Sequence, residues 1–159
     1  MKIRVGFGFD VHCLTEGEEL WLGGVLIPHI KGTVAHSDGD VLIHAICDAL
    51  LGAANLRDIG FHFPDTSSDF KGIDSKELLK KVIMLLDEKN WQVENIDCTL
   101  CLEKPKINPH ITNMMETLAP LLKTEIDAVS IKATTNEQMG FVGREEGVTA
   151  YAVALLKSK

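Results

Sequence analysis

Residues 36–54 read HSDGDVLIHAICDALLGAA and carry the clearest pattern in the chain. Within them apolar side chains recur at the spacing of one helix face. Ser37 or Asp38 stands where a side chain can cap the first turn. The segment therefore predicts a helix over residues 38–54 that buries one face. Its apolar positions are Leu42, Ala45, Ile46, Ala49, Leu50 and Ala53.

Strands are predicted on both sides of this helix. Residues 2–10 alternate apolar side chains with others, which is typical of a strand. Residues 20–27 form two short apolar runs joined by Gly23-Gly24, which predicts a hairpin. Near the C-terminus the alanine-rich stretch 150–154 fits a strand, although its pattern alone also fits a helix. Further strands are expected over 95–103, 128–134 and 148–156.

Two more helices complete the expected fold. One begins near Asp74, whose spacing to Glu77 is that of a capping box, and the other begins at Asn108-Pro109. Strands interleaved with helices predict an α+β fold, in which helices cover one face of a mixed sheet. No repeat or linker divides the chain, so a single domain over 1–159 is expected. The second face of the sheet needs cover, which favours a homo-oligomer.

The composition narrows the class of function. Sixteen basic residues are outnumbered by twenty-three acidic ones, and the formal net charge is -7. The basic residues form no run, which argues against a nucleic-acid-binding surface. The N-terminus lacks the apolar run of a signal peptide, and no stretch is apolar enough to span a membrane. We therefore expect a cytoplasmic protein with neither nucleic acid nor membrane as partner.

The four cysteines suit neither a disulfide framework nor paired zinc knuckles. Cys98 and Cys101 form a C-x-x-C, but they lie in a predicted strand, where residues three apart face opposite sides. A shared metal is therefore geometrically awkward. We interpret both as packing residues.

Asp10, His12 and His44 are the first candidates for chemistry. Asp10 and His12 lie two residues apart on an extended backbone, just after the first predicted strand, so both can project from one face. Imidazole and carboxylate ligands suit zinc, and three protein ligands leave a fourth position open to substrate or water. A D-x-H triplet also arises by chance, and a helix histidine is often a core residue. Both interpretations remain open.

A polar stripe runs along the helix, because Asp40, His44 and Asp48 follow one another at intervals of four residues. If one ring nitrogen of His44 binds metal, the other favours a carboxylate partner, and Asp40 or Asp48 lies within one turn. A solvated helix face would show the same stripe. The pattern alone does not separate these alternatives.

Two loops carry further polar candidates. Residues 58–66 place Asp58 and Asp65 at or near the ends of a turn-rich segment, where they could accept hydrogen bonds from a polyol or hold a cation. A surface turn has the same composition. His36 and Ser37 precede the helix at its positive end, where phosphate binds well.

Residues 132–147, KATTNEQMGFVGREEG, combine hydroxyls, glycines, a lysine and an arginine, a mixture suited to diphosphate oxygens. The Walker pattern is absent, so P-loop ATP hydrolysis has no support. Glu137 could hold a divalent cation between phosphates, because such ions take few protein carboxylates and let substrate oxygens supply the rest.

Taken together, DVH at 10–12 and the segments 36–54, 58–66 and 132–147 resemble the 2-C-methyl-D-erythritol 2,4-cyclodiphosphate synthase family of the non-mevalonate isoprenoid pathway. The resemblance spans nearly the whole chain. It implies a phosphorus-oxygen lyase whose substrate is 4-diphosphocytidyl-2-C-methyl-D-erythritol 2-phosphate. In that reaction the 2-phosphate attacks the β-phosphorus, and the products are the cyclodiphosphate and CMP.

The resemblance also implies a role for each matching residue. Asp10, His12 and His44 would bind Zn²⁺, and Glu137 would bind Mg²⁺ or Mn²⁺. Catalytic roles are expected for His36, Asp58, Thr135 and Glu137. Substrate contacts are expected from Asp10, His12, His36, Ser37, Asp58, Gly60, Phe63, Asp65, Leu102, Pro105, Lys106, Ala133, Thr134, Thr135, Glu137, Phe141 and Arg144.

Members of this family form homotrimers, which implies that this chain assembles through its sheets with active sites between subunits. Residues 102–106 and 133–135 would hold the cytidine. Arg144 and Glu146 match positions along the threefold axis, where an anion or isoprenoid diphosphate can be enclosed.

The loop departs from the family pattern, since Asn136, Gln138 and Met139 replace the more usual Thr, Lys and Leu. Altered contacts at the loop surface with unchanged chemistry are expected.

Two rival functions fit the same residues. A zinc phosphohydrolase would use the open metal position to activate water. A nonenzymatic module for CMP or isoprenoid diphosphate would use the metal only as a structural element. The nature of the product distinguishes all three.

Overall fold

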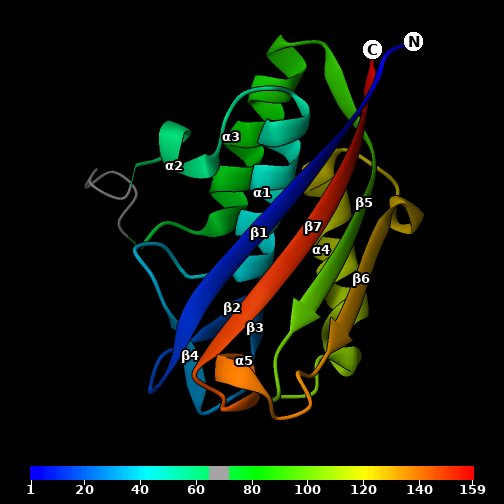
Figure 1. The fold of residues 1–159 in the computed structure, drawn as a ribbon. Coiled ribbons are helices and arrows are strands. Elements are labelled where there is room, and N and C mark those ends of the chain that lie inside the picture. The colour runs from blue at the N-terminus through cyan, green and yellow to red at the C-terminus, as the bar shows by residue number, and fades with distance from the viewer. Residues whose placement is uncertain (65–71) are drawn as a thin grey trace.

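A five-stranded mixed sheet forms the front of the molecule in the computed structural model, which describes residues 1–64 and 72–159 (Figure 1). Neighbouring strands are antiparallel except for the last pair, β5 and β6, which is parallel. The strand order is β4 (Lys31–Val34), β1 (Ile3–Glu16), β7 (Gly147–Ser158), β5 (Trp91–Cys101) and β6 (Val129–Thr134). β7 is therefore a strand and not a helix.

Three helices cover the rear face of this sheet in Figure 1, which confirms the expected single-domain α+β fold. They are α1 (Val41–Ala53), α3 (Ser75–Glu88) and α4 (Ile111–Leu122). No helix among the described residues is long and apolar enough to cross a membrane. The shorter elements are the hairpin β2 (Leu20–Leu22) and β3 (Val25–Ile27), the helices α2 (Ile59–His62) and α5 (Gly140–Gly143), and the 3-10 turns η2 (Asn108–His110) and η3 (Ile126–Ala128).

Strand β1 extends six residues beyond the predicted end at residue 10, because it pairs with β7 as far as Cys13 and with β4 as far as Glu16. Asp10 and His12 consequently lie within the strand and not after it. The Asn108-Pro109 pair begins a 3-10 turn without a side-chain cap, and α4 follows it. The extension of β1 arises from pairing with distant segments, which the local pattern does not contain.

Helix α1 lies directly on β1 because two glycines of the strand leave room for it. A Cβ at Gly8 would stand 1.9 Å from the carbonyl oxygen of Ala45, and a Cβ at Gly6 would stand 2.0 Å from that of Ala49. Four helix residues rise by about 6 Å and two strand residues by about 6.7 Å, so successive contacts along the helix match successive glycines along the strand. They run in opposite directions, which brings His44 towards Asp10 and His12.

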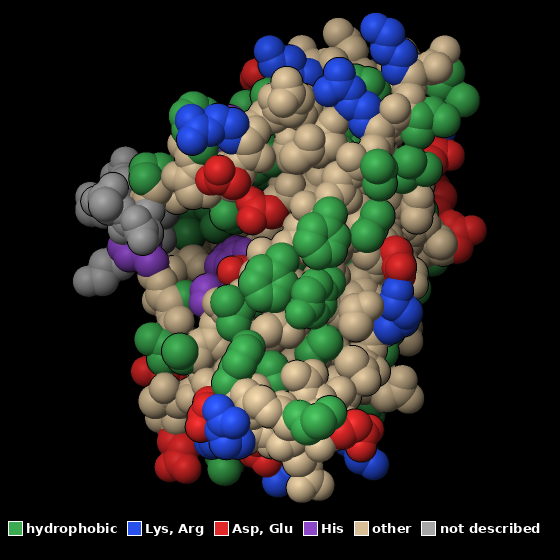
Figure 2. Space-filling model, viewed as in Figure 1, with side chains coloured by type: hydrophobic (Ala, Val, Ile, Leu, Met, Phe, Trp, Pro, Cys, Tyr) green, Lys and Arg blue, Asp and Glu red, His purple; other side chains and the backbone are tan. Residues whose placement is uncertain are grey.

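In the part of the chain that the structure describes, only the short helix α5 lies on the front side of the sheet, at its lower end in Figure 1, and the rest of this face is strongly apolar. Side chains alternate along β1, so the residues between the glycines point forward, away from α1. Figure 2 shows hydrophobic side chains gathered over β1 and β7 on this face. The large exposed ones on these two strands are Ile3, Val5, Phe7, Phe9, Val11, Tyr151 and Val153, which we call the open apolar face.

Candidate functional site

Asp10, His12 and His44 converge as predicted. Nε2 of His12 lies 3.1 Å from Nδ1 of His44, and each of these nitrogens lies 3.0 Å from Oδ2 of Asp10. Tetrahedral zinc with bonds of about 2.0–2.1 Å places its ligand atoms roughly 3.3 Å apart, so this triangle is close to the size that zinc requires. Among residues 1–64 and 72–159, no other group of three such side chains comes together in this way.

The hydrogen bonds of His44 leave one ring nitrogen available to a metal. The hydroxyl of Ser75 donates to Asp38, so its oxygen is free to accept from Nε2 of His44, 2.9 Å away. Nε2 can therefore donate to this hydroxyl, and Nδ1 is the nitrogen that faces Asp10 and His12. Nδ1 shares a proton with the Asp10 carboxylate at 3.0 Å and would offer its lone pair to a cation that replaced this proton. Ser37 Oγ lies 3.2 Å from the same Nε2. The hydroxyls of Ser37 and Ser75 thus orient the His44 ring, and the Asp38 carboxylate in turn accepts the hydrogen bond of Ser75.

The predicted partners of His44, Asp40 and Asp48, have other roles. Asp40 is fully buried, caps α1 through the N–H of Ile43 at 3.0 Å, and accepts from the N–H groups of Gly23 and Gly24. This tertiary contact explains why Asp40 caps the helix, in place of the expected Ser37 or Asp38. Asp48 accepts from the N–H of Ile59 at 2.7 Å and fixes the start of α2.

The opposite charges of Asp10 and the two histidines favour the ionised forms of Asp10 and His44, although both side chains are largely buried. Burial opposes ionisation of Asp10, but the hydrogen bonds and charges of His12 and His44 outweigh it and lower the pKa of that carboxyl. Burial likewise disfavours the charged form of His44, which is 9% exposed. The hydrogen bond and charge of Asp10, with smaller contributions from nearby carboxylates, outweigh this and raise the pKa of His44. A cation at this triangle would take the place of these protons.

A cavity of about 440 Å³ opens beside the triangle and brings together much of the predicted substrate site. Its described lining includes His12, His36, Ser37, His44, Gly60 and Phe63. Asp58 is not in this lining; it caps α2 by accepting from the N–H of Phe61 at 2.9 Å. The predicted contact Asp65 lies outside the described residues. Most of the loop predictions around the metal triangle therefore converge on one cavity.

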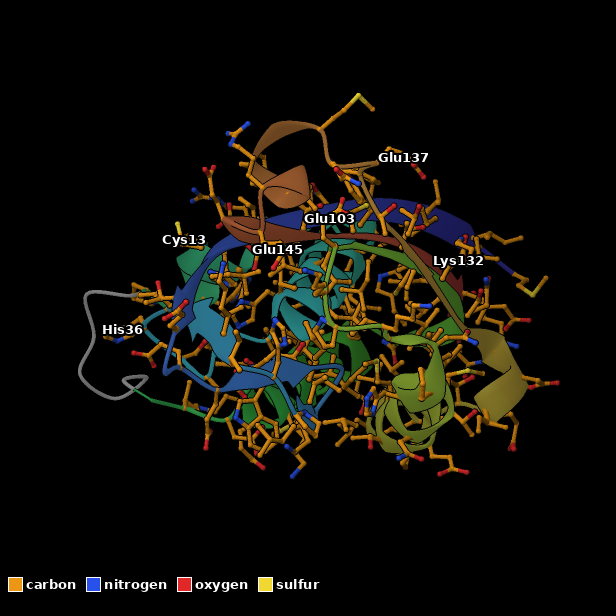
Figure 3. All side chains as sticks on the ribbon, turned by 90° about the horizontal axis from the view of Figure 1, so that it is seen from below. Cys13, His36, Glu103, Lys132, Glu137 and Glu145 are labelled. Atoms are coloured by element: carbon orange, nitrogen blue, oxygen red, sulfur yellow. The ribbon has the colours of Figure 1, made fainter. Side chains whose placement is uncertain are left out.

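A second, smaller cavity of about 200 Å³ lies between the ends of β5 and β6. It is lined by six predicted substrate contacts, Leu102, Pro105, Lys106, Ala133, Thr134 and Thr135. We call it the base cavity, and the cavity beside the metal triangle the metal cavity. In the strand order, β7 and β5 separate β1 from β6, so the two cavities are apart within one chain. Figure 3 shows His36 and Glu137 on opposite sides of the molecule.

Glu137 projects from the loop that follows β6. Its side chain is exposed, and Oε1 lies 3.5 Å from the hydroxyl of Thr135. Phe141 follows in α5 and is exposed, while Arg144 makes a paired ion contact with Glu146 at 3.0 Å. A cation at Glu137 would depend on other ligands, as expected for an ion bound mainly by phosphate oxygens.

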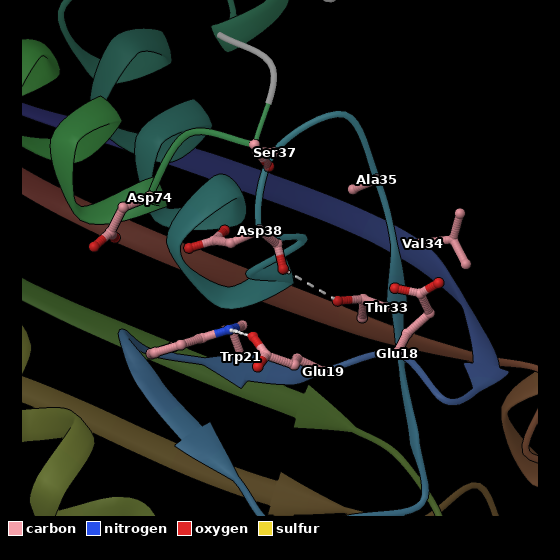
Figure 4. A pocket seen from close by; sticks show the side chains of 10 residues that line it. Glu18, Glu19, Trp21, Thr33, Val34, Ala35, Ser37, Asp38 and Asp74 are labelled. Atoms are coloured by element: carbon pink, nitrogen blue, oxygen red, sulfur yellow. Dashed lines mark hydrogen bonds between the residues drawn. The ribbon is translucent and has the colours of Figure 1, made fainter.

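A larger cavity, of about 570 Å³, lies on the other side of the segment that carries Ser37 (Figure 4). Glu18, Glu19, Asp38 and Asp74 contribute carboxylates to its lining. Such a surface repels phosphate, so size alone does not identify the functional cavity. The two cysteines of the C-x-x-C differ in burial, Cys98 being buried and Cys101 half-buried, and both thiols are free. Neither belongs to a metal-binding group among the described residues.

Comparison with known proteins agrees with this geometry. The YgbB family model matches residues 3–157. The 2-C-methyl-D-erythritol 2,4-cyclodiphosphate synthase of Bacteroides fragilis is 60% identical over 156 residues, which are 98% of each chain.

Two solved structures share the fold. The bifunctional IspDF from Campylobacter jejuni has a TM-score of 0.96 at 41% identity; the match covers 99% of this chain and 43% of that one. A 2C-methyl-D-erythritol-2,4-cyclodiphosphate synthase in a form bound to CDP has a TM-score of 0.90 at 37% identity, covering 97% of this chain and 100% of that one. This chain therefore belongs to the YgbB family, the family of the 2-C-methyl-D-erythritol 2,4-cyclodiphosphate synthases.

Proposed function

We propose that this protein, as a single domain over residues 1–159, is a cytoplasmic enzyme of the non-mevalonate isoprenoid pathway. It converts 4-diphosphocytidyl-2-C-methyl-D-erythritol 2-phosphate to 2-C-methyl-D-erythritol 2,4-cyclodiphosphate and CMP. The observation that carries the proposal is the convergence of Asp10, His12 and His44 beside the metal cavity. His36 and Ser37, which line the same cavity, supply phosphate contacts.

The reaction requires positioning more than acid–base chemistry. An oxygen of the 2-phosphate forms a bond to the β-phosphorus, and the bond from that phosphorus to the CMP oxygen breaks, so no protein nucleophile is needed. When bound, Zn²⁺ at Asp10, His12 and His44 and Mg²⁺ or Mn²⁺ at Glu137 supply positive charge that reduces repulsion between phosphates.

The protein residues hold the substrate in this arrangement. His36 and Ser37 orient the phosphate at the metal cavity, while Asp58 and Gly60 border the erythritol. Thr135 presents its hydroxyl beside Glu137 and positions the diphosphate. The base cavity surrounds the cytosine with backbone and apolar groups.

A homotrimer would complete the site. The metal cavity and the base cavity are apart within one chain, so one substrate could reach both only if two subunits contribute. The open apolar face supplies a surface for such assembly, because an exposed apolar patch of this kind is typical of an interface. We propose that the trimer forms through this face and places each active site between neighbours.

The ³¹P NMR spectrum of the product tests the reaction. Two coupled diphosphate signals together with free CMP are expected from wild-type protein with zinc and Mg²⁺. Solvent oxygen in a ring-open product would identify a phosphohydrolase, and unchanged substrate would identify a binding module. His44→Ala and Asp10→Ala should lose zinc and CMP release together. Full activity in a variant stripped of zinc would contradict the role assigned to the triangle.

The oligomeric state tests the assembly. Phe7 on the open apolar face is 64% exposed, and Met84 on α3 is 61% exposed. Phe7→Glu should therefore yield monomers in sedimentation velocity and lose activity, since a charge there prevents apolar contact. Met84→Glu is the matched control and should leave both unchanged. An active Phe7→Glu monomer would show that one chain holds a complete site.

A further inference from the structure

Glu103 joins two segments of the site that are distant in the chain. It lies just beyond the end of β5, and its Oε1 accepts from the backbone N–H of Asn136 at 2.7 Å and of Gln138 at 3.3 Å. These two amides lie on either side of Glu137. One carboxylate oxygen therefore holds the backbone before and after the residue proposed to bind the second cation, and Figure 3 shows Glu103 and Glu137 towards the same side, away from His36.

The loop needs such a contact because its backbone is unusual. Glu137 and Gln138 have φ angles of 51° and 62°, a left-handed conformation that residues other than glycine seldom adopt. Such residues keep this conformation where the surrounding structure holds them. The side chain of Glu137 is exposed and offers no packing of its own. The hydrogen bonds from Glu103 thus act where the loop is intrinsically least stable.

Helix α5 confines the loop from another side. A Cβ at Gly143 would stand 2.1 Å from the carbonyl carbon of Gln138, so the loop rests directly on the helix backbone. The N–H of Gly143 also donates to the carbonyl of Met139 at 3.1 Å. The loop is therefore held between α5 and Glu103, which leaves it little freedom to carry Glu137 elsewhere.

Glu103 also borders the base cavity, together with Lys106 and Thr135. We propose that Glu103 is a positioning residue, which fixes Glu137 relative to a cytidine in the base cavity. A nucleoside diphosphate bound there then presents its phosphates where the cation at Glu137 is held. This inference rests on the proposed function and adds a residue to it. Glu103 acts through the loop backbone and does not itself touch the reacting phosphates.

Glu103→Gln tests the proposal, because it keeps the side-chain size and an acceptor oxygen but removes the charge that strengthens both hydrogen bonds. Hydrogen–deuterium exchange of the peptide covering 135–139 should become on the order of tenfold faster. By calorimetry, the gain in CDP affinity that Mn²⁺ gives should fall on the order of tenfold. The affinity for CMP without Mn²⁺ should stay within about twofold, since the base cavity is intact.

Glu145→Gln is the matched control. It removes a carboxylate that pairs with Lys104, the neighbour of Glu103, at 2.9 Å. Exchange of the 135–139 peptide and the response to Mn²⁺ should match those of the wild type. If Glu145→Gln changed the exchange rate and the response to Mn²⁺ as much as Glu103→Gln does, the effect would come from the loss of any nearby negative charge, and the proposal would be overturned.

Three other results would also overturn it. These are unchanged exchange in Glu103→Gln, faster exchange with an undiminished response to Mn²⁺, and a loss of CMP affinity as large as that of CDP. Failure of the wild type to bind CDP would instead count against the proposed function. The exchange rates would still decide whether Glu103 holds the loop.

Discussion

Gly8→Ala should separate α1 from β1 and so disrupt the metal triangle without altering any ligand. The new Cβ would stand 1.9 Å from the carbonyl oxygen of Ala45. A carbon–oxygen contact normally begins near about 3.3 Å, so the helix would have to retreat by about 1.4 Å if it absorbed the whole clash. The contacted atom belongs to the backbone and cannot rotate away, as a flexible side chain could.

The expected cost follows from this displacement. Overpacking of a core typically costs about 1–3 kcal/mol, and a backbone clash favours the upper end. For a chain of this size, about 3 kcal/mol lowers the melting temperature by roughly 6–12 °C. Metal–ligand distances tolerate only about 0.2 Å, so a shift of this size in His44 should weaken zinc binding by about 100-fold or more.

Gly52→Ala provides the control on the same helix. A Cβ at Gly52 meets nothing within 4 Å, so alanine should raise stability by about 1 kcal/mol through helix propensity and leave zinc affinity unchanged. Thermal unfolding at one protein concentration and competition with a chromophoric zinc chelator measure both quantities. Wild-type stability and zinc affinity in Gly8→Ala would refute the close contact between α1 and β1.

Three further outcomes are expected. Ser75→Ala removes the hydroxyl that orients the His44 ring and should weaken zinc binding about tenfold in the chelator competition assay. An unchanged zinc affinity would show that Ser75 does not orient this ring. Asp40→Ala deprives three backbone N–H donors of their acceptor and should lower the free energy of unfolding in urea by about 3 kcal/mol. Burial raises the pKa of Cys98 to about 12, so little of its thiolate exists at pH 8. Iodoacetamide should therefore label the exposed Cys13 and spare the buried Cys98. Detection of labelled Cys98 in the native protein by mass spectrometry would contradict this.

Periodicity predicted most of the main elements and made Asp10, His12 and His44 candidates for one site, while the resemblance to the family singled out these three as metal ligands. The helix at 41–53 shows its apolar spacing in the sequence, and Asp10 and His12 share a face because strand side chains alternate. That alternation also explains why the two remain together although β1 is longer than predicted. Local rules of this kind do not depend on which segment lies next to the strand.

The residues that support the site could not be predicted in this way. Ser75 follows a helix cap in the sequence, and only the packing of α3 against α1 brings it to His44. The choice of Asp40 as the cap depends on two amides of the β2–β3 hairpin. Glu103 holds amides more than thirty residues away. Each contact depends on tertiary structure, for which spacing along one segment carries no signal.

The alternation along β1 also limits how the chain can change in length. One residue inserted between Gly8 and Asp10 would move Asp10 and His12 to the front of the sheet, among the aromatic side chains, if residues 3–8 kept their pairing with β7 and the strand continued without a bulge. The aspartate and histidine would then be lost from the metal triangle while every residue of the triangle was still present. Insertion of two residues would return both side chains to the α1 face but would shift them by about 6.7 Å along the strand, which is more than one turn of α1. Length variation is therefore tolerable only beyond the ends of this contact.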